Sequence, residues 1–176
     1  MWYTYGKEGD IMLKYFDMLK KAGAVKAAQI DASTIVTAPW TIYKCQHGCD
    51  FYGKSYCCPP RVPTWKETQE MIDCYHYGIL FNLHEDSHIG VTPLAVEVAR
   101  EAFLDGYYKA IAFGSGPCLI CKECALETCR FPKKTLPSME GCGIDVFKTA
   151  RNNGFEIQTI RERQEEHNYF GLILFE

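Results

Sequence analysis

The sequence lacks an apolar run long enough to cross a membrane. A transmembrane helix needs about 20 consecutive apolar residues, and no stretch of the 176-residue chain approaches that length. The opening MWYTYGKEGD also lacks the charged and then apolar pattern of an export signal. We therefore expect a cytoplasmic protein that does not associate with a membrane.

The sequence also lacks a large net charge, internal repeats and linker segments. The formal net charge is -3, so no basic field is present to attract nucleic acid. We find no internal repeat, low-complexity tract or linker. Hydrophobic residues make up 47% of the chain and charged residues 23%, which is ordinary for a globular protein. This length and composition predict a single domain over residues 1–176.

Cysteine is what the sequence has in excess, with ten residues of this type. Disulfide bonds are rare in a reducing cytosol. The chain is also too long for a disulfide-stapled mini-protein and has no export signal. Metal ligands or catalytic thiols are therefore the better interpretation of these cysteines.

The alternation of strand and helix patterns predicts an α/β fold with α+β character, a sandwich with a mixed sheet of about five strands and three to four helices. Capping residues start the expected helices at Asp10, Thr64, Thr92 and Ser138. These helices span 10–23, 64–75, 92–106 and 138–153. Strands are expected over 24–30, 77–83, 108–113, 155–160 and 169–175, with short extended pieces over 34–36 and 40–43. The last two strands should be antiparallel, because their connection is too short for a crossover.

The stretch from Gly114 to Pro137 is the most informative part of the chain. It carries four cysteines with the spacing Cys-x2-Cys-x2-Cys-x4-Cys, namely Cys118, Cys121, Cys124 and Cys129. It shows no sustained helical or strand periodicity, and a structureless loop of this length is uncommon unless something orders it. Metal bonds can supply that order, because metal binding and local folding are then one event.

The spacing of these four cysteines favours an iron–sulfur cluster of the 4Fe-4S type. Bacterial ferredoxins use Cys-x2-Cys-x2-Cys-x3-Cys-Pro, and this loop lengthens only the last spacing by one residue. Zinc sites usually split their ligands into two knuckles a dozen or more residues apart. Zinc remains the alternative metal, and thiol chemistry is a further one because Cys-x2-Cys also serves disulfide exchange.

A second cysteine region spans residues 45–58 and contains Cys45, Cys49, Cys57 and Cys58. Adjacent cysteines rarely reach the same metal, because successive side chains point apart, and we favour Cys58 over Cys57 as the ligand. This region either forms a second centre or donates one sulfur to the main loop, as happens between the clusters of two-cluster ferredoxins. One or two centres are thus compatible with the sequence.

Two further cysteines lie outside both regions. Cys142 could complete a set of ligands, whereas Cys74 falls on a helical pattern and is expected to be a small core residue.

Two other motifs match known patterns without the structural context that those patterns need. Residues 48–55, GCDFYGKS, match the P-loop expression, but Pro59 and Pro60 prevent the helix that a P-loop needs after its lysine. Residues 84–88, HEDSH, match the zinc-protease pattern, but they leave a strand instead of lying on a helix. We therefore expect neither nucleotide binding nor protease chemistry.

Three segments together, CQHGCDFYGKSYCCPP, GPC-x2-C-x2-C-x4-CRFP and PSMEGCGIDV, give the sequence a specific resemblance. The chain resembles a family of cysteine-rich predicted metal-binding proteins, a domain of unknown function found mainly in anaerobic prokaryotes. The resemblance implies metal ligands at Cys45, Cys49, Cys58, Cys118, Cys121, Cys124 and Cys129. It also implies a role beside the centre for Ser138, Glu140 and Asp145, and it leaves Cys57 as an extra cysteine.

The leading hypothesis is a cytoplasmic iron–sulfur protein that transfers electrons or supports a redox enzyme, with a redox partner protein. Backbone amides near Gly114, Gly116 and Gly141 would tune the sulfurs. One alternative is a structural zinc module that mediates protein contacts. The other is an enzyme whose metal or cluster binds its substrate at an open position, with the polar groups near the first region being His47, Tyr52, Lys54 and Arg61.

Overall fold

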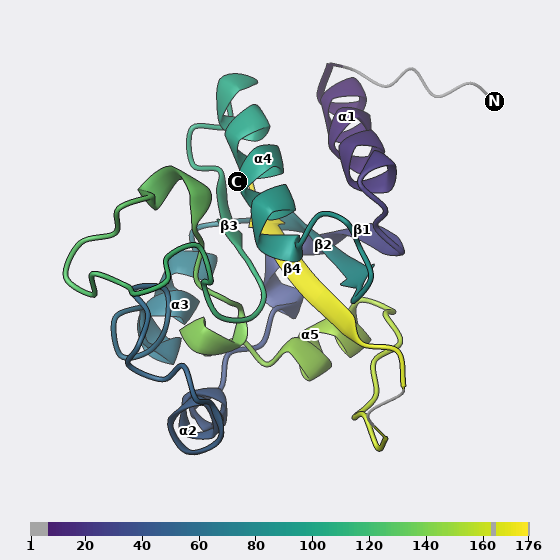
Figure 1. Ribbon diagram of the computed structural model, residues 1–176. Coiled ribbons are helices and arrows are strands. Elements are labelled where there is room, and N and C mark those ends of the chain that lie inside the picture. The colour runs from purple at the N-terminus through teal and green to yellow at the C-terminus, as the bar shows by residue number, and fades with distance from the viewer. Residues whose placement is uncertain (1–6, 163–164, 176) are drawn as a thin grey trace.

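The computed structural model describes residues 7–162 and 165–175, and this part of the chain contains one four-stranded sheet (Figure 1). The strands run in the order β1-β2-β4-β3, and each of the three pairings between them is antiparallel. Their bounds are β1 Lys26–Asp31, β2 Tyr77–His84, β3 Ile111–Phe113 and β4 Asn168–Leu174. The fold is therefore α+β with an antiparallel sheet, where the sequence predicted a mixed one.

Both faces of the sheet are buried, and this explains the continuous apolar runs in β2 and β4. In register, Leu80 lies opposite Leu172, and Ile79 lies opposite Ile173. Successive side chains of a strand point to opposite faces. Leu80 and Leu172 accordingly join one apolar cluster, and Ile79 and Ile173 join another. The sheet thus separates two cores.

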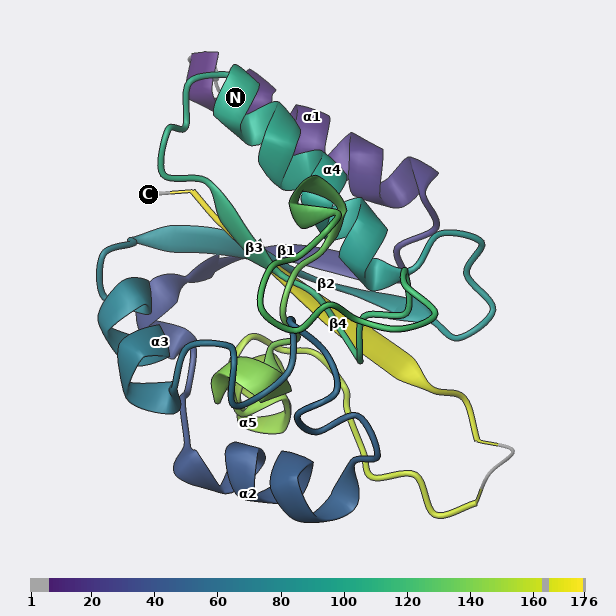
Figure 2. The ribbon, with the colours of Figure 1, turned by 60° about the vertical axis from the view of Figure 1, so that its left-hand side comes forward.

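Helices α1, Lys7–Lys21, and α4, Val91–Leu104, cover one face of the sheet (Figure 2). Tyr15 of α1 is fully buried, and its ring stacks on that of Phe175 with 5.2 Å between the ring centroids. Its hydroxyl donates a hydrogen bond of 2.9 Å to Asp105 at the end of α4, and Lys14 forms a 2.8 Å ion pair with the same carboxylate. These contacts fix the two helices to each other.

The opposite face carries α3, Trp65–Ile72, α5, Val146–Asn152, and the 3-10 turn η3, Glu140–Cys142. Thr64 and Glu67 form the predicted capping box at the start of α3. Helix α2, Pro39–Gly48, lies farther from the sheet and packs against η3 (Figure 2). Because α2 carries the first cysteines, this second layer holds the candidate site.

Helix α2 contradicts the extended piece that we expected over 40–43. Pro39 occupies the first helical turn, where a proline is favourable because the missing N–H would be unpaired there anyway. This proline therefore marks the start of a helix over the residues that we expected to be extended.

The strand expected over 155–160 is also wrong, and with it the pairing of the last two predicted strands. The Ile157 carbonyl accepts a 3.1 Å hydrogen bond from the Arg151 guanidinium and takes part in no strand ladder. Phe155 is buried and meets Phe170 edge-on, at 5.6 Å between ring centroids. The apolar residues of this segment therefore enter the core from irregular chain.

The helix expected over 138–153 is split into η3 and α5. Gly143, between them, has a φ of 88°, and a Cβ atom there would collide with Trp65. Asp145 then caps α5 by accepting a 2.9 Å hydrogen bond from the Lys148 N–H. At the other end of the chain, Asp10 lies inside α1 and is not its cap, whereas Gly23 ends that region with the expected positive φ of 91°.

The described part of the chain has five α-helices, one more than the upper number predicted. None of them combines the length and the apolar character that a bilayer crossing requires.

Candidate metal centre

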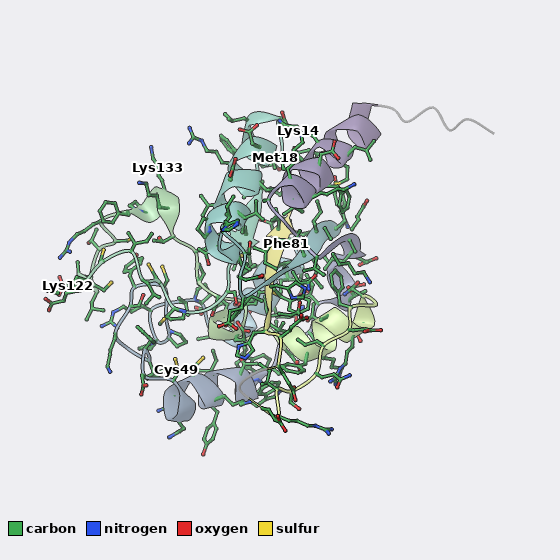
Figure 3. All side chains as sticks on the ribbon, turned by 45° about the vertical axis from the view of Figure 1, so that its right-hand side comes forward. Lys14, Met18, Cys49, Phe81, Lys122 and Lys133 are labelled. Atoms are coloured by element: carbon green, nitrogen blue, oxygen red, sulfur yellow. The ribbon has the colours of Figure 1, made fainter. Side chains whose placement is uncertain are left out.

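The two cysteine regions lie on neighbouring segments of the second layer. Cys45 lies on α2, Cys49 caps its C-terminus, and Cys57 and Cys58 follow in the connection to α3. The main loop connects β3 to the short turn η2, Pro132–Lys134, and has no helix or strand of its own between them. Figure 3 shows Cys49 at the end of α2 and Lys122 on the main loop.

Backbone amides join the two regions through sulfur. The Tyr56 N–H donates a 3.2 Å hydrogen bond to the Cys124 Sγ, across 68 positions of sequence. The Cys118 N–H interacts in the same way with the sulfur of Cys58. The two cysteine regions therefore form one thiol-rich part of the structure.

Three thiols of the first region share a cavity. Cys45, Cys49 and Cys58 line a space of about 240 Å³ together with Ser138 and Glu140. Burial raises the pKa of the Cys45 thiol, and Cys49, Glu140 and Cys58 raise it further as nearby negative groups. Cys45 and Cys49 reach the same cavity because residues four apart lie on one face of a helix.

Glu140 and Ser138, which the family resemblance singled out, both border this cavity. The Ser138 hydroxyl accepts a 3.0 Å hydrogen bond from the Gly141 N–H. Glu140 is an exposed residue at the edge of the cavity, and desolvation of its carboxyl group by the surrounding protein raises the pKa of that group. Asp145 is engaged instead as the cap of α5.

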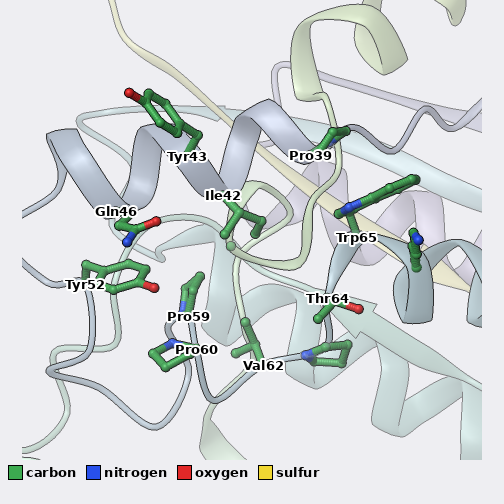
Figure 4. A pocket seen from close by; sticks show the side chains of 13 residues that line it. Pro39, Ile42, Tyr43, Gln46, Tyr52, Pro59, Pro60, Val62, Thr64 and Trp65 are labelled. Carbon is green, nitrogen blue, oxygen red and sulfur yellow. The ribbon is translucent and has the colours of Figure 1, made fainter.

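A separate cavity of about 500 Å³ lies between α2 and the start of α3 (Figure 4). Proline and aromatic side chains dominate its lining, among them Pro39, Tyr43, Pro60 and Trp65, and no cysteine contributes to it. Tyr52 borders this space as well as the thiol-lined cavity. The apolar cavity thus adjoins the thiols without containing them.

A second group of thiols forms around Thr135. The Thr135 Oγ1 lies 3.6 Å from the Cys129 Sγ and also hydrogen-bonds the sulfur of Cys57. Burial raises the pKa of the Cys57 thiol to about 11, with Cys118 and Cys129 contributing as neighbouring negative groups. The Phe131 N–H donates a 3.4 Å hydrogen bond to the Cys129 Sγ. Cys57 therefore shares its surroundings with the main loop.

Cys124 differs from the other thiols in its electrostatics. The N–H groups of Leu126 and Tyr56 lower the pKa of the Cys124 thiol, and the charges of Arg130 and Arg61 act in the same direction. Leu126 has a positive φ of 61°, which is uncommon for a residue other than glycine. Cys121, like Cys124, is half-buried on the same loop.

Two of the three amides that we predicted, those of Gly114 and Gly141, do not reach sulfur, whereas near Gly116 the Cys118 N–H reaches the Cys58 sulfur. The Gly114 N–H donates to the Pro137 carbonyl, and the Gly141 N–H donates to Ser138. Tyr56, Cys118, Leu126 and Phe131 supply the N–H groups instead. No sequence motif identified Tyr56, Leu126, Phe131 or Thr135 in this role, because each acts through its position in the folded loops.

A family comparison supports a metal-binding role for this thiol-rich part. The family described as "Predicted metal-binding protein (DUF2284)" matches residues 28–175, most of the chain. The chain belongs to this family. Comparison with curated proteins and with solved structures gives no match. The resemblance noted from the sequence is thereby confirmed, and the protein is a member of a predicted metal-binding family whose metal is not specified.

The donor set of this family member fits a thiolate-bound metal. All ten cysteines are free thiols, and thiolate sulfur is the ligand of iron–sulfur clusters and of structural zinc. Within residues 7–162 and 165–175, no three His, Cys, Asp or Glu side chains are grouped closely enough to hold a metal ion. The thiols of the described loops are thus near one another without being gathered around one point.

The two cysteines outside the main regions have contrasting surroundings. Cys74 is exposed at the end of α3, where its Sγ donates a 3.4 Å hydrogen bond to the Glu70 carbonyl, so the expected core position is wrong. Cys142 is completely buried, and that burial raises the pKa of its thiol to about 12. Its proposed part in completing a ligand set stays a prediction.

The structural contexts expected for the two rejected motifs are confirmed. No helix begins at Lys54 in the described chain; the next one starts at Trp65. His84 ends β2 and His88 lies in the following loop, so the two imidazoles do not share a helical face.

Proposed function

We propose that this protein is a cytoplasmic iron–sulfur protein, with a 4Fe-4S cluster, that transfers electrons or assists a redox system. One observation carries the proposal: free thiols from two distant segments are brought together with backbone N–H groups directed at their sulfurs. The Tyr56 N–H to Cys124 Sγ hydrogen bond of 3.2 Å is the clearest instance. Such hydrogen bonds stabilise thiolates and tune the potential of a cluster.

We assign seven cysteines of the two cysteine regions as metal ligands. The main loop provides four of these ligands, Cys118, Cys121, Cys124 and Cys129. The residues that line the cavity provide the other three, Cys45, Cys49 and Cys58. The loop between β3 and η2 has no regular structure. It can therefore adjust as the thiols close on a metal, because metal binding and local folding are coupled.

The exposure of the loop suits exchange of single electrons with a partner protein. Cys121 and Cys124 are half-buried, and Leu119 and Ile120 beside them are 71% and 46% exposed. A cluster held there would lie near the surface, where a redox partner protein can approach it. We propose such a protein as the partner, and we propose no nucleic acid and no membrane.

The thiol-lined cavity favours a second candidate function. Three thiols, a carboxyl group and the Tyr52 side chain border a space of about 240 Å³. A metal or cluster held by Cys45, Cys49 and Cys58 would leave a position facing this space. An enzyme that binds a small substrate at that position is therefore the alternative to pure electron transfer.

Metal analysis of protein prepared without air tests the proposal. We expect a brown protein with broad visible absorption that contains iron and acid-labile sulfide in equal amounts. Replacement of Cys121 by serine should reduce this content without unfolding the sheet. A colourless protein with stoichiometric zinc would overturn the iron–sulfur proposal in favour of a structural zinc module.

A further inference from the structure

The adjacent cysteines 57 and 58 have different thiol neighbours, except that both interact with Cys118. Cys58 lines the cavity that Cys45 and Cys49 also line, and Cys57 does not border that cavity. Cys57 instead interacts with Cys118 and Cys129 and with the Thr135 hydroxyl. Thr135 lies 3.6 Å from the Cys129 Sγ, so one hydroxyl connects thiols from the two regions. Cys58 therefore lies with Cys45 and Cys49, Cys57 lies with Cys129, and Cys118 lies between these two groups.

Cys57 is buried outside the two apolar clusters. Only 6% of its surface is exposed, yet it belongs to neither of the two apolar clusters that flank the sheet. Cys142, which is more deeply buried, belongs to one of these clusters. Its thiol is instead beside other thiols and the Thr135 hydroxyl, which are polar neighbours for a buried cysteine.

The number of thiols exceeds what one centre can bind. Cys74 is exposed and hydrogen-bonded to its own helix, and Cys142 is packed in the apolar cluster. The remaining eight cysteines lie in the two regions. Structural zinc sites and cubane clusters each take four protein ligands. If the two groups both bind metal, they must do so at separate centres.

Building on the proposed function, we propose that the protein holds two metal centres, divided at the Cys57–Cys58 peptide bond. Cys58 joins Cys45 and Cys49 at the cavity centre. Cys57 joins Cys118 and Cys129 at the loop centre, so that only one of Cys121 and Cys124 supplies the fourth thiolate and the ligand set assigned above is revised at that position.

This division gives the cysteine pair a role in electron transfer. Consecutive Cα atoms are about 3.8 Å apart, so ligands at residues 57 and 58 bring their two centres close together. An electron that enters at the exposed loop centre then has a short route to the centre at the cavity. The cysteine that was an extra in the family resemblance becomes the residue that anchors the loop centre to the first region.

Single and double substitutions in the full chain test the division through metal content. Cys57→Ser should remove the metal and sulfide of one centre, about half of the total. Adding Cys129→Ser should remove nothing more, because both residues serve the same centre. Adding Cys49→Ser to Cys57→Ser should remove nearly all the metal. Cys74→Ser is the matched control and should leave the content unchanged.

The same variants separate this inference from the proposed function. If the unaltered protein binds zinc and no iron–sulfur cluster, the iron–sulfur proposal fails, and the zinc content of the variants then decides the two-centre division. A Cys57→Ser protein with the full metal content would overturn the division. So would a Cys57→Ser and Cys49→Ser double variant that retains as much metal as Cys49→Ser alone.

A second measurement needs no substitution and covers the case in which Cys57→Ser fails to fold. The metal-free chain is treated briefly with diamide, which accepts two electrons and two protons from each pair of thiols that becomes a disulfide. Peptide mapping should then find Cys57 linked to Cys118 or Cys129, and Cys58 linked to Cys45 or Cys49. The opposite pairing would overturn the proposal.

Discussion

The two faces of the sheet are covered in different ways. On one face, α1 and α4 bury Leu19, Phe81 and Val98 completely within a continuous apolar cluster. On the other, α3 and α5 pack on the sheet, and beyond them amide-to-sulfur hydrogen bonds join the two cysteine regions, as between Tyr56 and Cys124. Apolar burial can stabilise the first layer by itself. We propose that a metal supplies comparable order to the outer part of the second layer.

Metal removal should have the largest effect, and it should loosen only the face of the sheet that carries the cysteine regions. We expect amide hydrogen exchange over residues 50–62 and 115–131 to accelerate by at least about 100-fold, since metal binding contributes about 10 kcal/mol to folding in small metal-dependent domains. Mass spectrometry of peptides before and after chelation measures this. The amides of β2 are the internal control and should stay protected. Equal loss of protection in both layers would show that the faces are not independent.

Phe81→Ala tests the apolar side. The ring is completely buried against α1 and α4, and its removal should cost about 3–5 kcal/mol of unfolding free energy because it leaves a cavity. Urea denaturation measures the loss, and Phe81→Leu should show a smaller one. Metal content per folded molecule should not change. A variant that loses metal while still folded would contradict the separation of the two layers.

The thiols themselves should differ in reactivity when the metal is absent. The Leu126 and Tyr56 N–H groups lower the pKa of Cys124, whereas burial raises the pKa of Cys57 to about 11. Only the thiolate reacts with iodoacetamide, so Cys124 should be alkylated at least about 100-fold faster than Cys57 at neutral pH. The rate at Cys124 should also level off at a lower pH. Comparable rates from peptide mapping would contradict this electrostatic contrast.

The smallest effect on stability is expected from a change at the start of helix α3 in the second layer. Thr64 accepts a hydrogen bond from the Glu67 N–H at the start of α3, and Thr64→Ala should cost about 1 kcal/mol in stability. Thr64→Ser keeps the hydroxyl and is the matched control. Thermal or urea unfolding measures the difference. A cost well above this value would mean that α3 depends on its cap far more than on its packing.

Local sequence patterns predicted a helix or strand correctly where a single pattern, such as a capping box or an apolar run, was present. The capping box at Thr64 and the apolar run of β2 were identified, because each depends on residues that are close in sequence. The extended piece over 40–43 was predicted wrongly, because Pro39 is compatible both with the edge of a strand and with the first turn of a helix. The strand predicted over 155–160 was wrong for another reason. Phe155 is buried as a strand residue would be, but the Ile157 carbonyl accepts a hydrogen bond from the Arg151 side chain instead of from a neighbouring strand.

For the candidate site, the sequence identified which residue type matters and in which two regions. It did not identify the exposure of Cys74 or the neighbours of Cys57, because both depend on how separate elements pack. Glu140 was singled out only through the family resemblance, and its place beside Cys45 became visible in the fold.

The sequence by itself determined that this protein belongs to a thiol-rich metal-binding family, since cysteine spacing and composition are properties of the chain. Only the tertiary structure decided which thiols meet. Cys57 and Cys129 are far apart in sequence, and they approach the same Thr135 hydroxyl because α2 and β3 deliver their loops to one place. Spacing limits what a short loop can reach, whereas contact between loops is set by the packed elements that hold their ends.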